Sequence, residues 1–221
     1  MNAVIFDFNG VIVDDEPQHM RAFATVLKTQ GVELTEASYF ERYLGFDDRD
    51  LFRRVLADHG RTPSTDEVAA LVADKAEAYL RELEGGFELC AGAADLVQAC
   101  AKRYPLAIGS GARHHEIVLI LERSGLDDCI DVIVSADDVS AGKPDPETYQ
   151  KAFDVLCSRH AGLRPEDCVV IEDAPNGIRA ARGAGMRTIA VCASRSRADL
   201  AEADRIVDSL ADLSASDLFP G

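Results

Sequence analysis

The segment Cys168-Val-Val-Ile-Glu-Asp-Ala-Pro-Asn-Gly177 indicates the fold class of this chain. Its short apolar run, Val169–Ile171, is followed at once by two acidic residues, which is typical of a buried strand that ends at a polar edge. The residues that come next, Gly177–Ala184, have the spacing of an amphipathic helix. A strand that leads directly into a helix is the repeating unit of α/β proteins, so this segment predicts that class.

The same succession of strand and helix recurs on both sides of this segment. Further apolar runs are Val4–Phe8, Leu106–Ile108, Val132–Val134, Thr188–Val191 and, more weakly, Arg205–Val207; further helical segments are Ala93–Arg103, Glu116–Ser124 and Pro146–Leu156. This alternation predicts an α/β fold with a Rossmann-like parallel sheet sandwiched by helices. Ligands of such sheets bind beyond the carboxyl ends of the strands.

The alternation stops between Asp15 and Gly85. Helical patterns fill this stretch at Pro17–Gln30, Ser38–Tyr43, Asp48–His59 and Thr65–Leu83, and no strand pattern occurs. A helical block between the first and second strands predicts an inserted all-helical subdomain. We therefore expect a core domain made of residues 1–14 and 86–221 and a helical domain made of residues 15–85.

Composition and charge narrow the class of partner. The chain has 221 residues, 47% of them hydrophobic, and its 23 Lys and Arg against 39 Asp and Glu give a formal charge of −16. Such a charge argues against nucleic acid or an anionic membrane as partner. No signal-peptide pattern or apolar membrane span is present, and six cysteines without a C-x-x-C pair predict reduced core thiols, so a cytoplasmic protein is expected.

Polar residues stand at four of the predicted strand ends. They are Asp7, Ser110, Lys143 and the pair Glu172 and Asp173. A single carboxylate after a strand usually belongs to a turn, but three carboxylates with a hydroxyl and a lysine at one sheet edge indicate a site. Carboxylates that lie this close repel each other unless a cation sits among them, and Mg²⁺ suits an all-oxygen set of ligands.

These residue types fit phosphoryl transfer. Asp7 would be the nucleophile that forms an aspartyl-phosphate. Asp173 would hold Mg²⁺, and Glu172 would assist directly or through a metal-bound water. Lys143 and Ser110 would neutralise and hydrogen-bond the phosphoryl oxygens as charge redistributes.

The motifs that carry these residues resemble those of the haloacid dehalogenase superfamily. They are Asp7-Phe-Asn-Gly-Val-Ile-Val-Asp14, Ser110, Gly-Lys143-Pro-Asp-Pro and Ile-Glu172-Asp173-Ala-Pro-Asn-Gly-Ile, and the chain is most similar to the β-phosphoglucomutase-like phosphatase branch. The resemblance implies that the helical insertion is a cap. It also implies that Asp7, the backbone carbonyl of Asn9 and Asp173, supported by Glu172, bind Mg²⁺, and that Ser110 and Lys143 hold the phosphate.

Asn9 departs from the family pattern. The resemblance implies an Asp at this position as the general acid/base, and an amide cannot exchange protons near neutral pH. General acid–base catalysis contributes about 10²- to 10⁴-fold, so the site should bind phosphate but turn over slowly. Either Asp15 supplies the displaced acid, or Asn9 was introduced to arrest turnover, or the protein is a naturally slow phosphatase or a phosphate-binding relative.

Other residues are candidates for substrate contact. Specificity is expected in the helical insertion, because caps of this kind close over the site. The substrate-binding candidates are Asp15, His19, Gly45, Arg49 and Lys75 in the insertion, and Gly111 and Arg113 beside Ser110. For Arg49 and Lys75 an exposed helix position is the alternative, and Arg113 could equally cap a helix. Asp48 stands where mutases of the family carry an Arg for a second phosphate, which favours a monophosphate hydrolase.

The sequence therefore predicts a Mg²⁺-dependent phosphatase acting on a small phosphorylated metabolite, with a sugar phosphate as the expected substrate. The alternatives are a β-phosphoglucomutase-type isomerase, a dehalogenase, and a catalytically impaired phosphate-binding protein. A monomer is the expected oligomeric state.

Overall fold

The computed structural model describes residues 1–193 and 195–219. The chain forms two compact units, one from Met1–Asp14 with Glu88–Gly221 and the other from Asp15–Phe87. We call the first the α/β unit and the second the helical unit, and describe each by itself.

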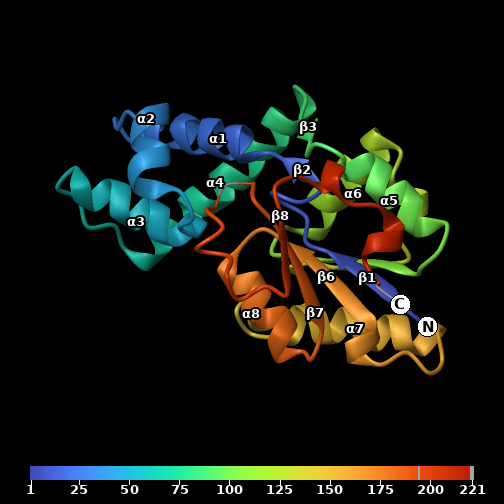
Figure 1. The fold of residues 1–221 in the computed structure, drawn as a ribbon. Coiled ribbons are helices and arrows are strands. Elements are labelled where there is room, and N and C mark those ends of the chain that lie inside the picture. The colour runs from blue at the N-terminus through green and yellow to red at the C-terminus, as the bar shows by residue number, and fades with distance from the viewer. Residues whose placement is uncertain (194, 220–221) are drawn as a thin grey trace. The chain divides into compact units, whose positions relative to one another are not determined.

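The α/β unit is built on a parallel sheet of six strands in the order β5-β4-β1-β6-β7-β8 (Figure 1). The strands are β1 (Ala3–Phe6), β4 (Leu106–Gly109), β5 (Val132–Val134), β6 (Cys168–Glu172), β7 (Arg187–Val191) and β8 (Arg205–Val207). All their pairings are parallel, so the predicted α/β class with a Rossmann-like sheet is confirmed. The strand order reverses between β1 and β6, which is where sheets of this type bind ligands.

Helices cover both faces of this sheet. They are α5 (Ala93–Ala101), α6 (His114–Ser124), α7 (Glu147–Arg159) and α8 (Pro175–Gly183), with short turns η2 (Asp127–Cys129), η3 (Pro165–Asp167), η4 (Leu210–Asp212) and η5 (Ala215–Asp217). In Figure 1, α7 and α8 lie on one face, and α5 and α6 lie on the other. Because both faces are covered, the central strands read as apolar runs with no alternation of polar residues.

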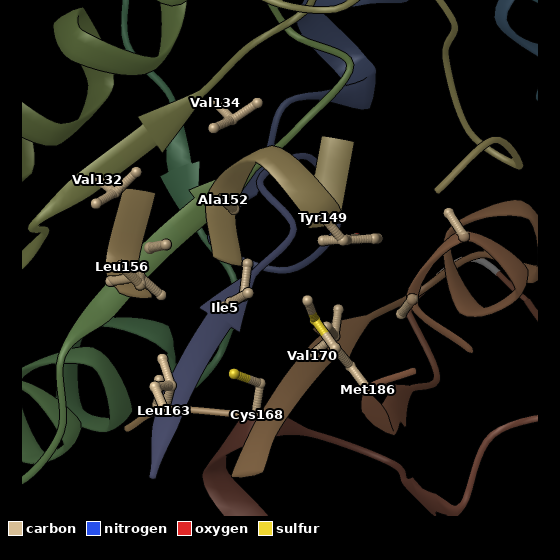
Figure 2. Packing of buried hydrophobic residues seen from close by; sticks show 14 residues of the cluster. Ile5, Val132, Val134, Tyr149, Ala152, Leu156, Leu163, Cys168, Val170 and Met186 are labelled. Carbon is tan, nitrogen blue, oxygen red and sulfur yellow. The ribbon is translucent and has the colours of Figure 1, made fainter. Parts of the chain in front are cut away.

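The core beneath α7 and α8 is closely packed. Alternate residues of the strands, such as Ile5 and Val170, meet Tyr149, Ala152 and Leu156 of α7 (Figure 2). Because this packing fixes α7 against the sheet, the side chains of α7 that face the carboxyl edge are held in place.

Two details of the strands differ from the sequence prediction. The first strand ends at Phe6 rather than Phe8, because the Phe8 carbonyl accepts hydrogen bonds from the N–H groups of Val11, Ile12 and Val13 and turns the chain. A short antiparallel pair, β2 (Val13–Asp14) with β3 (Glu88–Leu89), was not predicted, since two residues are too few to show a pattern.

The cysteines also differ from the prediction in part. All six are free, and Cys100 and Cys168 are buried. Burial raises the pKa of each of these two thiols to about 12. The prediction that all six lie in the core was wrong for the other four, which are half-buried.

The helical unit contains α1 (Glu16–Thr29), α2 (Glu36–Ser38), the π-helical turn η1 (Tyr39–Tyr43), α3 (Asp48–Asp58) and α4 (Thr65–Glu84). The sequence encodes the start of α4 directly, because Ser64 and Glu67 form a reciprocal capping box. Asp47 caps α3 by accepting a hydrogen bond from the backbone of Asp50. As predicted, this unit has no strand. The helix predicted at Ser38–Tyr43 is instead the end of α2 followed by η1.

No helix formed by the described residues combines the length and the apolar character that crossing a membrane requires.

Candidate active site

Three carboxylates meet at the point where the strand order reverses. Asp7 follows β1, Glu172 is the last residue of β6, and Asp173 follows it. The parallel pairing of β1 with β6 ends in a hydrogen bond of 2.8 Å from the Asp7 N–H to the Ile171 carbonyl, so both strands deliver their acidic residues to the same edge. One oxygen from each carboxylate lies within 4.8 Å of the others, so this group could hold a metal ion.

Lys143 joins two of these carboxylates. Its Nζ donates hydrogen bonds of 2.7 Å to Asp7 Oδ1 and of 2.7 Å to Glu172 Oε1. An ammonium group has three N–H donors, so one remains for a further acceptor. The lysine predicted from the sequence is therefore beside the predicted nucleophile, although the two are 136 positions apart.

The carboxylate of Glu172 is fully buried and already has four hydrogen-bond donors. Oε1 accepts from Lys143 Nζ at 2.7 Å and from the Tyr149 hydroxyl at 2.8 Å, while Oε2 accepts from the backbone N–H groups of Asp173 and Ala174, each at 2.9 Å. A carboxylate offers about four lone-pair positions, so those of Glu172 are used within the protein. With these hydrogen bonds in place, Glu172 orients the groups around it, and Asp7 and Asp173 are more available than Glu172 as ligands for a metal ion.

The electrostatics of the cluster favour a bound cation. Burial raises the pKa of Asp7 to about 7, against the opposing attraction of Lys143. Burial and the charges of Asp7 and Glu172 also raise the pKa of Asp173 well above 3.8. The attraction of Asp7 and Glu172 outweighs burial at Lys143 and raises its pKa. Ionising both aspartates thus costs free energy that a divalent cation would offset.

The turn after Asp7 brings its backbone close to Asp173. Gly10 has a φ of +75°, and a Cβ built on it would lie 2.4 Å from Asp173 Oδ2. Only glycine fits this approach. Asn9 lies in the same turn and forms an isolated β-bridge with Val13. The backbone of this turn is therefore next to the carboxylates, as a carbonyl ligand from Asn9 requires.

Ser110 lies at the end of β4, the neighbour of β1. It is buried, and its Oγ accepts a hydrogen bond of 3.0 Å from the Ala112 N–H. Gly111 and Arg113 follow it and are exposed. Arg113 is the N-cap residue of α6, and its backbone N–H donates to Glu116 Oε2 at 3.0 Å. Of its two predicted roles, the structure thus shows the one at the helix start.

A second polar cluster lies inside the helical unit. Lys75 Nζ is 2.7 Å from His19 Nδ1 and 3.0 Å from Asp48 Oδ1, and His19 Nε2 is 3.3 Å from Asp15 Oδ2. The Tyr79 hydroxyl donates to the same Asp15 oxygen, and its ring stacks on His19. Asp15 and Lys75 are both buried, so Lys75 is not the exposed helix residue that was its alternative interpretation.

Two predicted residues of the helical unit are not part of this cluster. Gly45 is exposed in the turn before α3 and has a φ of +88°. Arg49 is exposed on the first turn of α3, and no ion pair or hydrogen bond joins its side chain to another described residue in the structure. Gly45 and Arg49 therefore remain candidates by sequence position only.

Three residues that act on the carboxylate cluster were not predicted from the sequence. Tyr149 donates to Glu172, and the charge of Arg195, in the loop after β7, opposes a small part of the rise in the pKa of Asp173 that burial causes. Gly177 on α8 lies against the Glu172 carboxylate, and a Cβ there would be 1.6 Å from Oε1. Gly177 belongs to the sequence motif that contains Glu172 and Asp173, but only the packing of α8 against Glu172 shows why no side chain fits at this position.

Replacing Gly177 with Ala is expected to destabilise the protein by about 3 kcal/mol, because the four hydrogen bonds of Glu172 prevent it from moving away. Chemical denaturation of the variant and the parent measures this difference. Gly183→Ala on the same helix is the matched control. Its Cβ would meet Pro146 Cβ at an ordinary 3.4 Å, so it should leave stability unchanged or raise it slightly. Equal effects of the two substitutions would contradict the close packing of Gly177.

Comparison with known proteins shows the family of this chain. The family model of haloacid dehalogenase-like hydrolases matches residues 1–185. Fructose-1-phosphate phosphatase YqaB of Escherichia coli (strain K12) is 32% identical over 188 residues, which are 85% of this chain and 95% of that protein. Hexitol phosphatase B of the same strain is 30% identical over 222 residues, with 98% and 96% of the two chains covered.

Solved structures give the same result. An Asp-to-Asn variant of CbbY from Rhodobacter sphaeroides, in complex with xylulose-(1,5)bisphosphate, has a TM-score of 0.83 at 30% identity, and all of both chains is covered. The resemblance noted in the sequence is thus confirmed by a family model that spans most of the chain and by relatives that align along most of it. The chain belongs to the haloacid dehalogenase-like hydrolases.

Proposed function

We propose that this protein is a Mg²⁺-dependent phosphatase that hydrolyses the phosphate monoester of a small sugar or sugar alcohol. The observation that carries the proposal is the contact of Lys143 with Asp7 and Glu172 beside Asp173, because it combines a buried nucleophile, a cation for phosphoryl oxygens and free carboxylate ligands. The names of the two Escherichia coli relatives support the substrate class.

The residues present fit a magnesium ion. Asp7, Asp173 and the backbone carbonyl of Asn9 would hold it, and the burial that raises the pKa values of both aspartates supplies the reason for a cation there. When bound, Mg²⁺ supplies positive charge that screens the phosphate from the carboxylates.

The chemical steps assigned to the chain begin with Asp7. Its carboxylate oxygen attacks the phosphorus, the bond from phosphorus to the sugar oxygen breaks, and an aspartyl-phosphate forms. Lys143 and the Ser110 hydroxyl hydrogen-bond the phosphoryl oxygens during transfer. A water molecule then attacks the phosphorus, which releases inorganic phosphate and restores the Asp7 carboxylate.

Proton transfer to the leaving group is expected to limit the rate of hydrolysis. The departing sugar oxygen needs a proton, and the Asn9 amide cannot supply one near neutral pH. Asp15 is the candidate for a displaced acid; within the helical unit its carboxylate accepts from Tyr79 and lies beside His19. In the second candidate function, which Asn9 favours, the protein binds a phosphorylated metabolite and hydrolyses it very slowly or not at all.

The helical unit is assigned the role of a cap that selects the substrate. Its candidates for substrate contact are His19, Gly45, Arg49 and Lys75. Asp48 already pairs with Lys75, which reduces the positive charge that the unit offers to a second phosphate. This pairing favours a monophosphate over the bisphosphate chemistry of a β-phosphoglucomutase.

A screen of phosphorylated sugars and sugar alcohols tests the proposal. Phosphate release is measured with Mg²⁺ and with a chelator, in parallel on this chain and on Asn9→Asp, and isomerised products are read by chromatography. Mg²⁺-dependent release from at least one monophosphate is the expected result. Absence of release from every compound by both proteins would overturn the phosphatase assignment, and an isomerised product would favour the mutase.

The effect of Mg²⁺ on stability should depend on pH. The pKa of Asp7 is raised to about 7 in the folded protein, so the metal-free fold holds this proton more tightly than the unfolded chain and loses stability as pH rises from about 4 to about 7. Mg²⁺ binds the ionised carboxylates, so its stabilising effect should grow across the same range. Thermal unfolding at each pH, with Mg²⁺ or with a chelator, measures this stabilisation by Mg²⁺. Asp173→Asn, which removes a proposed metal ligand, is the control. A Mg²⁺ shift that is larger at acidic than at neutral pH would contradict this site.

A further inference from the structure

Tyr149 lies in the first turns of α7, six positions after Lys143, and is fully buried. The centroid of its ring is 4.7 Å from Lys143 Nζ, which is the distance of a cation–π contact. Its hydroxyl donates a hydrogen bond of 2.8 Å to Glu172 Oε1, the same oxygen that accepts from Lys143. Tyr149 therefore acts on Lys143 in two ways: its ring contacts the ammonium group directly, and its hydroxyl binds the Glu172 oxygen that accepts from Lys143.

The surroundings hold this side chain in one position. Burial, followed by the charges of Glu172 and Asp7, raises the pKa of Tyr149 well above 10.0, so the phenol keeps its proton and remains a donor. One side of the ring lies against β4, because a Cβ on Gly109 would be 3.0 Å from two of its carbon atoms. Tyr149 also belongs to the buried cluster beneath α7 (Figure 2).

We propose that Tyr149 is a positioning residue for Lys143: its ring and its bond to Glu172 fix the ammonium group so that the third N–H is directed to the phosphoryl oxygens. This inference rests on the proposed function. A lysine side chain has four rotatable bonds and ends in a compact charge. The hydrogen bonds to Asp7 and Glu172 alone therefore do not fix the direction of its third N–H. The ring of Tyr149 packs against the ammonium group of Lys143. Its hydroxyl is a second donor to Glu172 Oε1 and so fixes the position of that oxygen.

The consequence concerns the transition state more than the bound substrate. Negative charge is redistributed among the phosphoryl oxygens during transfer. An ammonium group that is already fixed in place stabilises this charge best, because the group does not have to reorganise in the transition state. Loss of the Tyr149 hydroxyl should therefore lower kcat more than it raises KM. Removal of a partner that orients a site residue typically costs about 10- to 100-fold.

The test compares two anions on Tyr149→Phe, which keeps the ring and removes the hydroxyl. Inorganic phosphate resembles the tetrahedral ground state, whereas orthovanadate adopts a five-coordinate geometry like that of the transition state. Dissociation constants of both are measured in the presence of Mg²⁺. The affinity for vanadate should fall about tenfold or more and that for phosphate much less, so their ratio changes. A purely structural role would lower stability and the folded fraction without changing this ratio.

Two further variants complete the experiment. Tyr104→Phe is the matched control, because the Tyr104 hydroxyl bonds to the Ala215 carbonyl at 3.3 Å away from the site, and its ratio should equal that of the parent. Gly109→Ala displaces the Tyr149 ring by contact while leaving its hydroxyl present, and should change the ratio in the same direction as Tyr149→Phe. It provides the answer if Tyr149→Phe does not fold.

The outcomes separate this inference from the proposed function. An unchanged vanadate-to-phosphate ratio in Tyr149→Phe, or in Gly109→Ala if the former is unfolded, overturns the positioning role. If the parent chain binds both anions but neither it nor Asn9→Asp hydrolyses a sugar phosphate, the phosphatase proposal fails while the ratio still reports on Tyr149. If the parent binds neither anion, both fail.

Discussion

Asp7→Asn is expected to reduce hydrolysis of an aryl phosphate by at least about four orders of magnitude, to the background rate. The variant keeps the size of the side chain but removes the oxygen that attacks phosphorus, and loss of a covalent nucleophile has effects of this size. An aryl phosphate is the appropriate substrate, because its leaving group needs little protonation and the reaction then depends on Asp7 rather than on Asn9. Mass spectrometry of the rapidly quenched parent protein should show a covalent phosphate that the variant lacks.

The fold should tolerate this change. Lys143 keeps Glu172 as its partner at 2.7 Å, and the variant no longer has a buried carboxyl group whose pKa is raised to about 7. Metal-free Asp7→Asn should therefore be at least as stable as the parent at neutral pH, while its stabilisation by Mg²⁺ should be greatly reduced. Asp154→Asn, an exposed change on α7, is the control and should leave both properties unchanged. Full activity of Asp7→Asn would exclude Asp7 as the nucleophile.

Asn9→Asp is expected to raise the rate of hydrolysis of a sugar phosphate by two or more orders of magnitude. A carboxyl group at this position would give a proton to the departing sugar oxygen and take one from the attacking water, and such catalysis contributes about 10²- to 10⁴-fold. The gain in kcat/KM, which reports on formation of the aspartyl-phosphate, should be large with sugar phosphates and small with aryl phosphates, because only the former have a leaving group that needs a proton in that step. Steady-state kinetics on both substrates measure the difference.

Two controls give this experiment a clear answer. Asn2→Asp introduces the same charge before β1, at the opposite end of that strand, and should change neither rate. Asp15→Asn in the parent chain examines the displaced acid, since loss of sugar phosphate hydrolysis there, together with no gain in Asn9→Asp, would assign the proton to Asp15. If Asn9→Asp gives no gain and Asp15→Asn gives no loss, neither residue is the acid, and a binding role is favoured.

The sequence was informative where structure follows from short-range patterns. The apolar run Val169–Ile171 and the helix after it predicted a strand and a helix that are observed as β6 and α8, because burial on both faces of a sheet leaves a recognisable run of apolar residues. The helix predicted at Thr65–Leu83 is likewise observed, as α4, and the structure shows that a capping box of Ser64 and Glu67 fixes its start. The pair β2 and β3 could not be found, since its strands contribute two residues each and lie far apart in the chain.

The same distinction between sequence and tertiary structure applies to the candidate site. The sequence by itself determined the family and the acidic and basic residues at the strand ends, because parallel strands must bring their carboxyl ends to one edge. Only the tertiary structure decided how those groups are used: that Glu172 has four donors of its own, that Tyr149 and Gly177 enclose it, and that burial raises the pKa of Asp7. Desolvation and hydrogen-bond saturation depend on every group packed around a side chain, and residues distant in the sequence supply those groups.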